Sequence, residues 1–112
     1  MIKWEKQTDI LGKNEYINCI EFIEENKCLI NFHPGTIHFC LPLLEQVKLN
    51  CKITFFSTFK KIVRYIAYKY CCDGKERNLF FKAALEKNAG FISNQEYEEL
   101  QYFLEKNIET KL

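Results

Sequence analysis

The clearest hydrophobic pattern in the chain runs through residues 55–72, FFSTFKKIVRYIAYKYCC. Projected on a helix at about 100° per residue, the apolar side chains gather within an arc of about 140°. They are Ile62, Phe55, Ile66, Phe59, Tyr70, Val63, Phe56 and Ala67. The pattern predicts a long amphipathic helix that starts between residues 54 and 57, has Thr54 or Ser57 as its N-cap and buries this arc. The preceding segment, 51–56, is compatible with strand or helix.

The opposite face of this predicted helix is basic and carries tyrosines, and the segment contains no acidic residue. Such a face suits an acidic protein surface, because tyrosine is enriched at interface hot spots. It also suits a nucleic-acid backbone, whose bases stack on aromatic rings. Most charge runs are only solvated faces, which is the competing interpretation. The predicted binding residues are Lys60, Lys61, Arg64, Tyr65, Tyr68 and Lys69.

The N-terminal part of the chain predicts strands. Residues 16–24, YINCIEFIE, are β-branched and aromatic on both faces, which favours a central strand. Pro34 and Gly35 occupy the two central positions that a type II turn prefers. The expected strands begin around Ile2 and Trp4 and continue over 16–24, 28–33 and 36–41. Together they predict an antiparallel β-meander of about four strands.

Helices are expected to follow the strands. Pro42 suits the first turn of a helix, so a short helix is predicted over 43–49. Asp73 and Gly74 break the long helix, and residues 76–88 resume helical spacing with Leu79, Phe80, Ala83 and Ala84 inward. Ser93 and Glu96 have the spacing of a capping box, which predicts a last helix from 94 to about 108. The predicted fold is therefore α+β, with an N-terminal β-meander packed against three or four C-terminal helices.

The length and composition predict one globular domain over residues 1–112. A chain of 112 residues can bury a core without disulfides or a metal. The N-terminus has charges where a signal peptide needs an apolar run, and no segment reaches the roughly 18 apolar residues of a membrane span. The core of so small a domain also needs the apolar arc that a membrane-surface helix would use. We therefore expect a cytoplasmic protein with no membrane partner.

The net charge of +1 conceals three blocks of different sign. Residues 1–52 carry six Lys against seven acids, residues 53–82 carry seven Lys or Arg against two acids, and residues 83–112 carry three Lys against six Glu. Separate charged faces of this kind can steer a charged partner. Only two of the sixteen basic residues are Arg, and the pI of about 7.6 is below the value of roughly 9 typical of nucleic-acid binders. Base-specific DNA recognition is therefore disfavoured.

The six cysteines predict reduced thiols in an apolar core, with Cys19, Cys28 and Cys40 among apolar strand residues. Cys71 and Cys72 lie beside basic residues that could lower a thiol pKa, so their reactivity is left open. His33, His38 and Cys40 flank the Pro34-Gly35 turn, but their spacing does not match that of structural zinc ligands. Neither a metal nor a cofactor is predicted.

No catalytic motif is present, since the chain lacks GxSxG, HExxH, a phosphate-binding Gly-rich loop and paired carboxylates. The sequence therefore predicts that the protein is not an enzyme. The leading hypothesis is a small cytoplasmic module that binds another protein with an acidic surface and neutralises or regulates it, as immunity proteins, antitoxins and phage inhibitors do. The alternative is a nucleic-acid-binding regulator that uses the basic helix. A small enzyme with a Cys/His site is the third reading.

Overall fold

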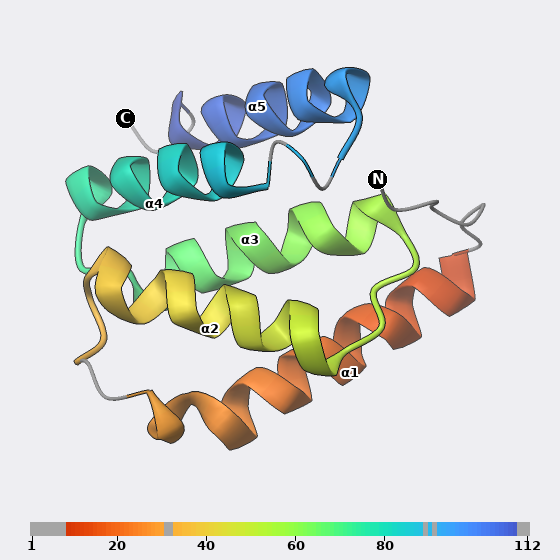
Figure 1. The fold of residues 1–112 in the computed structure, drawn as a ribbon, viewed down its shortest axis with the longest axis horizontal. Helices are drawn as coiled ribbons and strands as arrows, with labels where there is room; N and C mark the ends of the chain where they lie inside the picture. Colours follow the sequence, from red (N-terminus) through yellow and green to blue (C-terminus); the bar gives the residue numbers. More distant parts are fainter. Residues whose placement is uncertain (1–8, 31–32, 89, 91, 110–112) are drawn as a thin grey trace.

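The computed structural model describes residues 9–30, 33–88, 90 and 92–109, and these form a bundle of α-helices (Figure 1). The elements are α1 (Asp9–Asn26), the 3₁₀ helix η1 (Lys27–Leu29), α2 (Ile37–Asn50), α3 (Phe56–Tyr70), α4 (Gly74–Lys87) and α5 (Asn94–Glu109). No sheet occurs in the described part of the chain, where the β-type pairing consists of one isolated parallel bridge between Gly35 and Cys71. The predicted α+β fold is therefore wrong.

Helix α3 is the centre of the bundle. In Figure 1 it runs across the middle, with α1 and α2 on one side of it and α4 and α5 on the other. It contacts each of these four helices. A helix surrounded in this way must be apolar around much of its circumference, which explains why its hydrophobic arc was the strongest pattern in the sequence.

The prediction for α3 is confirmed in its extent and its buried face. The helix begins at Phe56, and Phe59, Ile62, Val63, Ile66 and Ala67 are fully buried. Its predicted N-cap is wrong, because Phe55 occupies that position and makes no side-chain cap. Instead the carboxylate of Glu15 on α1 accepts hydrogen bonds from the Thr54 N–H at 2.8 Å and the Phe55 N–H at 3.1 Å. The N-terminal end of α3 is therefore held by a contact with a distant part of the sequence.

The strand predicted over 16–24 is helical and belongs to α1. Tyr16, Cys19, Ile20 and Ile23 follow one another at intervals of three, one and three residues, which places them on one helix face. Cys19 and Ile23 are almost fully buried, and Tyr16 and Ile20 pack against the same core. The β-propensity of Ile and Tyr favoured a strand, but burial of this face decides the structure. The strand expected around Ile2 and Trp4 lies outside the described residues.

The strand predicted over 36–41 and the short helix predicted over 43–49 form one helix, α2. It begins five residues before Pro42, which therefore lies inside the helix. An interior proline removes a backbone hydrogen bond and costs about 3 kcal/mol, whereas full burial of a side chain such as Phe39 contributes about 1.5–3 kcal/mol. The residues that offset this cost share one buried face and are Phe39, Cys40, Leu43, Leu44 and Val47.

The strand predicted over 28–33 is also wrong. Cys28 and Leu29 lie in η1, which continues directly from α1, and both side chains are exposed. Residues 31 and 32 lie outside the described part of the chain. Gly35 has the positive φ, +113°, that the predicted type II turn requires at this position.

The two C-terminal helices are confirmed. Asp73 caps α4, and its Oδ1 accepts a hydrogen bond from the Glu76 N–H at 2.9 Å. Phe80 and Ala84 are fully buried as predicted and Ala83 is half-buried, but Leu79 is 43% exposed. The capping box of α5 is present in both directions, because Ser93 N–H donates to Glu96 Oε1 at 2.9 Å and Glu96 N–H donates to Ser93 Oγ at 3.2 Å.

Among the helices of the described residues, none is both long and apolar enough to span a membrane.

Candidate functional site

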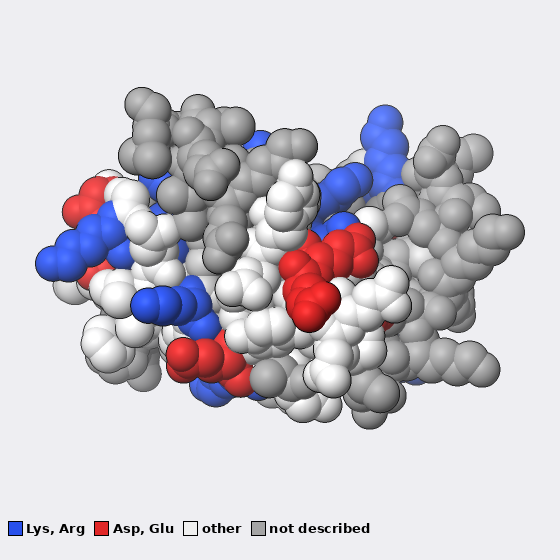
Figure 2. All heavy atoms as spheres, turned by 90° about the horizontal axis from the view of Figure 1, so that it is seen from above, with Lys and Arg blue, Asp and Glu red and all other residues white. Residues whose placement is uncertain are grey.

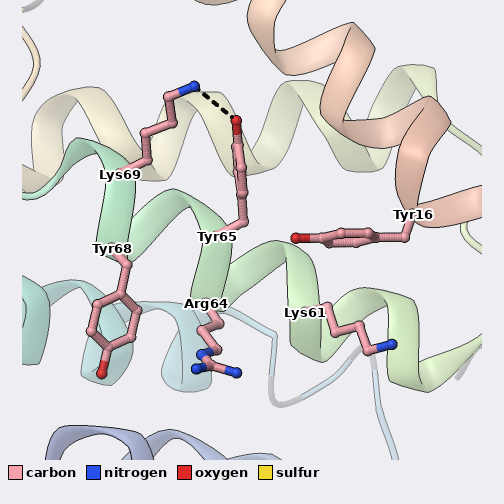
Figure 3. Close-up of a pocket in the computed structure, with 6 residues that line it drawn as sticks. All are labelled: Tyr16, Lys61, Arg64, Tyr65, Tyr68 and Lys69. Atoms are coloured by element: carbon pink, nitrogen blue, oxygen red, sulfur yellow. Dashed lines mark hydrogen bonds between the residues drawn. The ribbon is translucent and has the colours of Figure 1, made fainter. Parts of the chain in front are cut away.

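An open groove of about 690 Å³ lies along α3 where α1 approaches it (Figure 3). Five of the six predicted binding residues line it, together with Tyr16 from α1. The five are Lys61, Arg64, Tyr65, Tyr68 and Lys69, whose spacing of three or four residues places them on one helix face. The structure therefore brings most of the predicted face into a single concave surface, which we call the α1–α3 groove.

Lys60, the sixth predicted residue, does not line the groove. Its Nζ lies 2.8 Å from Glu99 Oε1 on α5, and the Lys60 side chain is only 17% exposed. The same Nζ lies over the rings of Phe56 and Phe103, at 5.2 and 5.4 Å from their centroids. On a helix, Lys60 is about 100° from Lys61, which turns it toward α5. We therefore assign Lys60 to the packing between α3 and α5.

One end of the groove is organised by the carboxylate of Glu24 on α1. Its Oε1 lies 2.8 Å from Lys27 Nζ and 3.0 Å from Lys69 Nζ. Its Oε2 accepts hydrogen bonds from the hydroxyl of Tyr65, at 2.9 Å, and from that of Tyr70. Lys69 Nζ also donates to the Tyr65 hydroxyl at 3.0 Å, the dashed contact in Figure 3. These bonds hold Lys69 and Tyr65 in fixed positions.

The protonation states at this end follow from the same contacts. Burial raises the pKa of Glu24, but the hydrogen bonds from Lys27, Tyr70, Lys69 and Tyr65 outweigh it and lower the pKa to about 2. The hydrogen bonds of Lys69 to Tyr65 and Glu24 raise the pKa of its ammonium group. Glu24 is therefore ionised and Lys69 charged at neutral pH, and Lys69 shares the Glu24 carboxylate with Lys27.

Lys61 and Arg64 are the cations that the groove offers to a ligand. Both side chains are exposed, and neither forms an ion pair with an acidic residue of the described chain. Their contacts are instead with rings, since Lys61 Nζ lies 5.9 Å from the ring centroid of Tyr16 and Arg64 Cζ lies 5.7 Å from that of Tyr68. Such contacts orient a cation without neutralising its charge.

The ring of Tyr68 is held by both α3 and α4. The guanidinium carbon of Arg77 lies 4.5 Å from its centroid, closer than that of Arg64. Phe81 packs against it with ring centroids 6.5 Å apart at an angle of 57°. Tyr68 is therefore an ordered part of the wall of the groove.

Sequence reasoning missed Tyr16, which lines the groove from α1, and Arg77, which packs on the Tyr68 ring from α4. Tyr16 was assigned to a strand, so its approach to α3 was not foreseen. Burial raises the pKa of Tyr16, as does the nearby Tyr65, while Arg64 opposes them. Its hydroxyl is therefore protonated at neutral pH, when it can donate a hydrogen bond. The helical spacing of Tyr16 with Cys19, Ile20 and Ile23 was the signal that could have placed it on the core face of a helix.

The polar groups of the groove are cations and phenol hydroxyls, which favour a ligand with negative charge and hydrogen-bond acceptors. The face on the α5 side carries charges of both signs (Figure 2). Figure 2 views the molecule from the side where α5 lies, and its basic and acidic side chains form small separate groups with uncharged atoms between them. That face is not uniformly basic, in keeping with the net charge of +1.

The prediction that Cys19, Cys28 and Cys40 are core thiols is confirmed for Cys19 and Cys40 and is wrong for Cys28. Cys19 and Cys40 are buried as predicted, Cys51 and Cys71 are half-buried, and Cys28 and Cys72 are exposed. All six are free thiols. Within the described residues no three His, Cys, Asp or Glu side chains gather in a group that could hold a metal ion.

Comparisons with known proteins gave no relative from which a function could be transferred. A scan against protein-family models, a search of curated proteins and a search of solved structures each found no match. The function must therefore be argued from the chemistry of the α1–α3 groove.

Proposed function

We propose that the protein is a small cytoplasmic binding module that holds an acidic segment of a partner protein in the α1–α3 groove and thereby neutralises or regulates that partner. The observation that carries this proposal is the pair of exposed cations, Lys61 and Arg64, without an acidic partner in the described chain. They lie in a groove whose other lining residues are Tyr16, Tyr65, Tyr68 and Lys69. Tyrosine and arginine are enriched among residues that dominate protein–protein binding.

The groove is prepared for binding because its side chains are already ordered. Tyr65 is fixed by Glu24 and Lys69, and Tyr68 is fixed by Arg77 and Phe81. A ligand that meets ordered side chains loses less conformational entropy on binding. The carboxylates of an acidic segment could accept hydrogen bonds from Lys61, Arg64 and the Tyr16 hydroxyl while these cations keep their positions over the rings.

Nucleic acid is the second candidate for the same groove, since its cations and rings could hold phosphates and bases. The ring contacts favour the protein partner. Arg64 and Arg77 lie over Tyr68, and Lys61 lies over Tyr16, so a base that stacked on either ring would have to displace a cation. Lys69 already pairs with the Glu24 carboxylate, so the groove presents two cations without an acidic partner in the described residues, fewer than the six to ten phosphate contacts of a strongly salt-dependent DNA-binding protein.

A binding titration tests the proposal. Fluorescence anisotropy is measured with a labelled poly-glutamate peptide, with a poly-lysine peptide of equal length as the charge control. We expect the acidic peptide to bind the wild type, and the Lys61→Glu/Arg64→Glu variant to lose most of that binding. The matched control is Lys82→Glu/Lys87→Glu, which reverses two exposed lysines on α4 and makes the same change in net charge. Equal losses in the two variants would show only a general charge effect and would contradict the proposal.

An oligothymidylate probe separates the nucleic-acid candidate from the protein candidate. If phosphates were the ligand, this probe would bind more tightly than the peptide, and its affinity would fall steeply and linearly with the logarithm of salt concentration. That result would replace the proposed function by nucleic-acid binding.

A further inference from the structure

Two pairs of cysteines occupy equivalent positions in the fold. In each pair a buried cysteine within a helix lies close to a cysteine at the C-terminal cap of another helix. Cys40 of α2 meets Cys71 at the end of α3, with the sulfur atoms 3.6 Å apart. Cys19 of α1 and Cys51 at the end of α2 line the same small cavity. The two pairs thus link α2 to α3 and α1 to α2.

The backbone around Cys71 is held against the start of α2. Gly35 forms a parallel bridge with Cys71, and its carbonyl oxygen accepts a hydrogen bond from the Cys72 N–H at 3.2 Å. From α4, Glu76 Oε2 accepts a hydrogen bond from the Ile37 N–H at 3.3 Å. These contacts keep the Cys71 sulfur next to that of Cys40, which is itself fixed in the core.

We propose that Cys40 and Cys71 form a reversible oxidation site, which a low-molecular-weight disulfide converts into a bond between α2 and the C-terminal end of α3. The sulfur atoms need to approach by only about 1.5 Å to reach the length of a disulfide bond. Cys71 is half-buried, so a small oxidant can reach it, whereas Cys40 is sealed in the core.

The reaction proceeds in two exchanges. The Cys71 thiolate attacks one sulfur of the oxidant RSSR, which forms a mixed disulfide and releases RS⁻. Cys40 then gives its proton to a released thiolate and attacks the Cys71 sulfur, which breaks the mixed disulfide and releases the second RS⁻. In sum, two protein thiols lose two electrons and two protons, and RSSR becomes two RSH. Excess RSH reverses both exchanges.

The second pair lacks the feature that starts this reaction and so serves as an internal control. The hydrogen bond from Cys40 lowers the pKa of the Cys71 thiol, and Arg77 lowers it further against the opposing effect of burial. Burial instead raises the pKa of Cys51, and it raises the pKa of Cys19 to about 12. The thiolate is the nucleophile in thiol–disulfide exchange, so oxidation selects Cys40 and Cys71.

Mapping the bond requires a chain in which each tryptic peptide holds one candidate cysteine. Trypsin would leave Cys28 with Cys40 on residues 28–48, and Cys71 with Cys72 on residues 70–75. The full-length Cys28→Ser/Cys72→Ser variant removes this ambiguity by changing two exposed residues. It is incubated in its folded state with oxidised glutathione, alkylated, digested and analysed by mass spectrometry. The wild type, read by tandem fragmentation, replaces the variant if the variant does not fold.

We expect the linked peptides to be 28–48 with 70–75, and excess reduced glutathione to restore the free thiols. The bond should also raise the melting temperature by roughly 10 °C, since it closes a loop of about 30 residues in the unfolded chain. Cys51→Ala should leave the bond unchanged, whereas Cys40→Ala should trap glutathione on Cys71. A Cys19–Cys51 bond, or a folded protein that keeps all its thiols, would overturn the proposal.

Discussion

Replacing Glu24 by glutamine removes the charge that holds one end of the α1–α3 groove together. In the wild type, Glu24 Oε1 faces two lysines and Oε2 accepts from two tyrosine hydroxyls. Glutamine has one acceptor oxygen, so its amide group must face one of these two pairs of donors. The neutral side chain also leaves Lys27 and Lys69 without their counter-charge.

The expected loss of stability can be judged from the hydrogen bond that is most shielded from solvent, the one from Tyr70 to Glu24. A hydrogen bond to a charged group contributes about 1.5–3 kcal/mol to stability, and Tyr70, which donates one, is only 8% exposed. The carboxylate itself is in a side chain that is 30% exposed, so solvent reduces this value. We therefore expect Glu24→Gln to lower the free energy of unfolding by about 1–2 kcal/mol at neutral pH, as measured by urea denaturation.

The effect of Glu24→Gln on stability should depend on pH. The pKa of Glu24 is about 2 in the folded protein, compared with an ordinary value of 4.5. Between these values the unfolded chain binds more protons than the folded one, so the stabilisation is complete above about pH 5 and is lost as the pH falls toward 2. The difference in unfolding free energy between wild type and Glu24→Gln should shrink over the same range.

The matched control is Glu21→Gln. Glu21 lies on the same helix, is exposed, and takes part in none of the hydrogen bonds or ion pairs around Glu24. Its substitution should change stability by less than about 0.5 kcal/mol. Equal effects of the two substitutions at pH 7, or a Glu24→Gln effect of constant size from pH 7 to pH 3, would refute the reasoning.

Other predictions concern local geometry, and each is tested by the midpoint of urea denaturation. Ser93→Ala should lower the free energy of unfolding by about 1 kcal/mol, because it removes the acceptor for the Glu96 N–H; an unchanged midpoint would mean that this cap does not stabilise α5. Gly35→Ala should cost about 1–3 kcal/mol, because Gly35 has a φ of +113° and an added Cβ would lie 3.3 Å from that of Cys72. The control Gly74→Ala meets no atom within 4 Å and should be neutral or stabilising; destabilisation of equal size would contradict the strain at Gly35.

The extent and the buried face of helix α3 could be predicted from the sequence because its hydrophobic pattern is local. Its apolar arc repeats with the helical period over four turns, and the residues of that arc are the ones that neighbouring helices bury. Its start could be bracketed, but its cap could not. The Thr54 and Phe55 N–H groups are held by Glu15, about 40 residues earlier, and no pattern near α3 reveals that contact.

The N-terminal helices were missed because residue type and residue spacing disagreed. In α1, isoleucine, tyrosine and phenylalanine have high β-propensity, yet Tyr16, Cys19, Ile20 and Ile23 are spaced as one face of a helix. Propensity is a weak preference that burial overrides. In α2, Pro42 seemed to mark a beginning, whereas Phe39 and Cys40 on its N-terminal side are needed in the core.

The candidate site shows the same division between local and long-range information. Five of its residues share one face of α3 and could be found from their spacing. Tyr16 could not be added without knowing that α1 is a helix packed against α3. Lys60 could not be removed without knowing that α5 supplies Glu99 on that side. The sequence thus indicates the basic face, and the packing of the helices decides which of its charges remain available.

The availability of Lys61 and Arg64 is the central claim, and one titration followed by NMR tests it most directly. Poly-glutamate peptide is added to isotopically labelled protein, and the chemical shifts of the backbone amides are recorded in wild type, in Lys61→Glu/Arg64→Glu and in Lys82→Glu/Lys87→Glu. We predict saturable shifts that centre on Lys61, Arg64, Tyr65 and Tyr68, that persist in the α4 variant and that vanish in the α3 variant. Shifts spread evenly over all basic residues, or a folded α3 variant that binds as tightly as the wild type, would contradict a binding function for the α1–α3 groove.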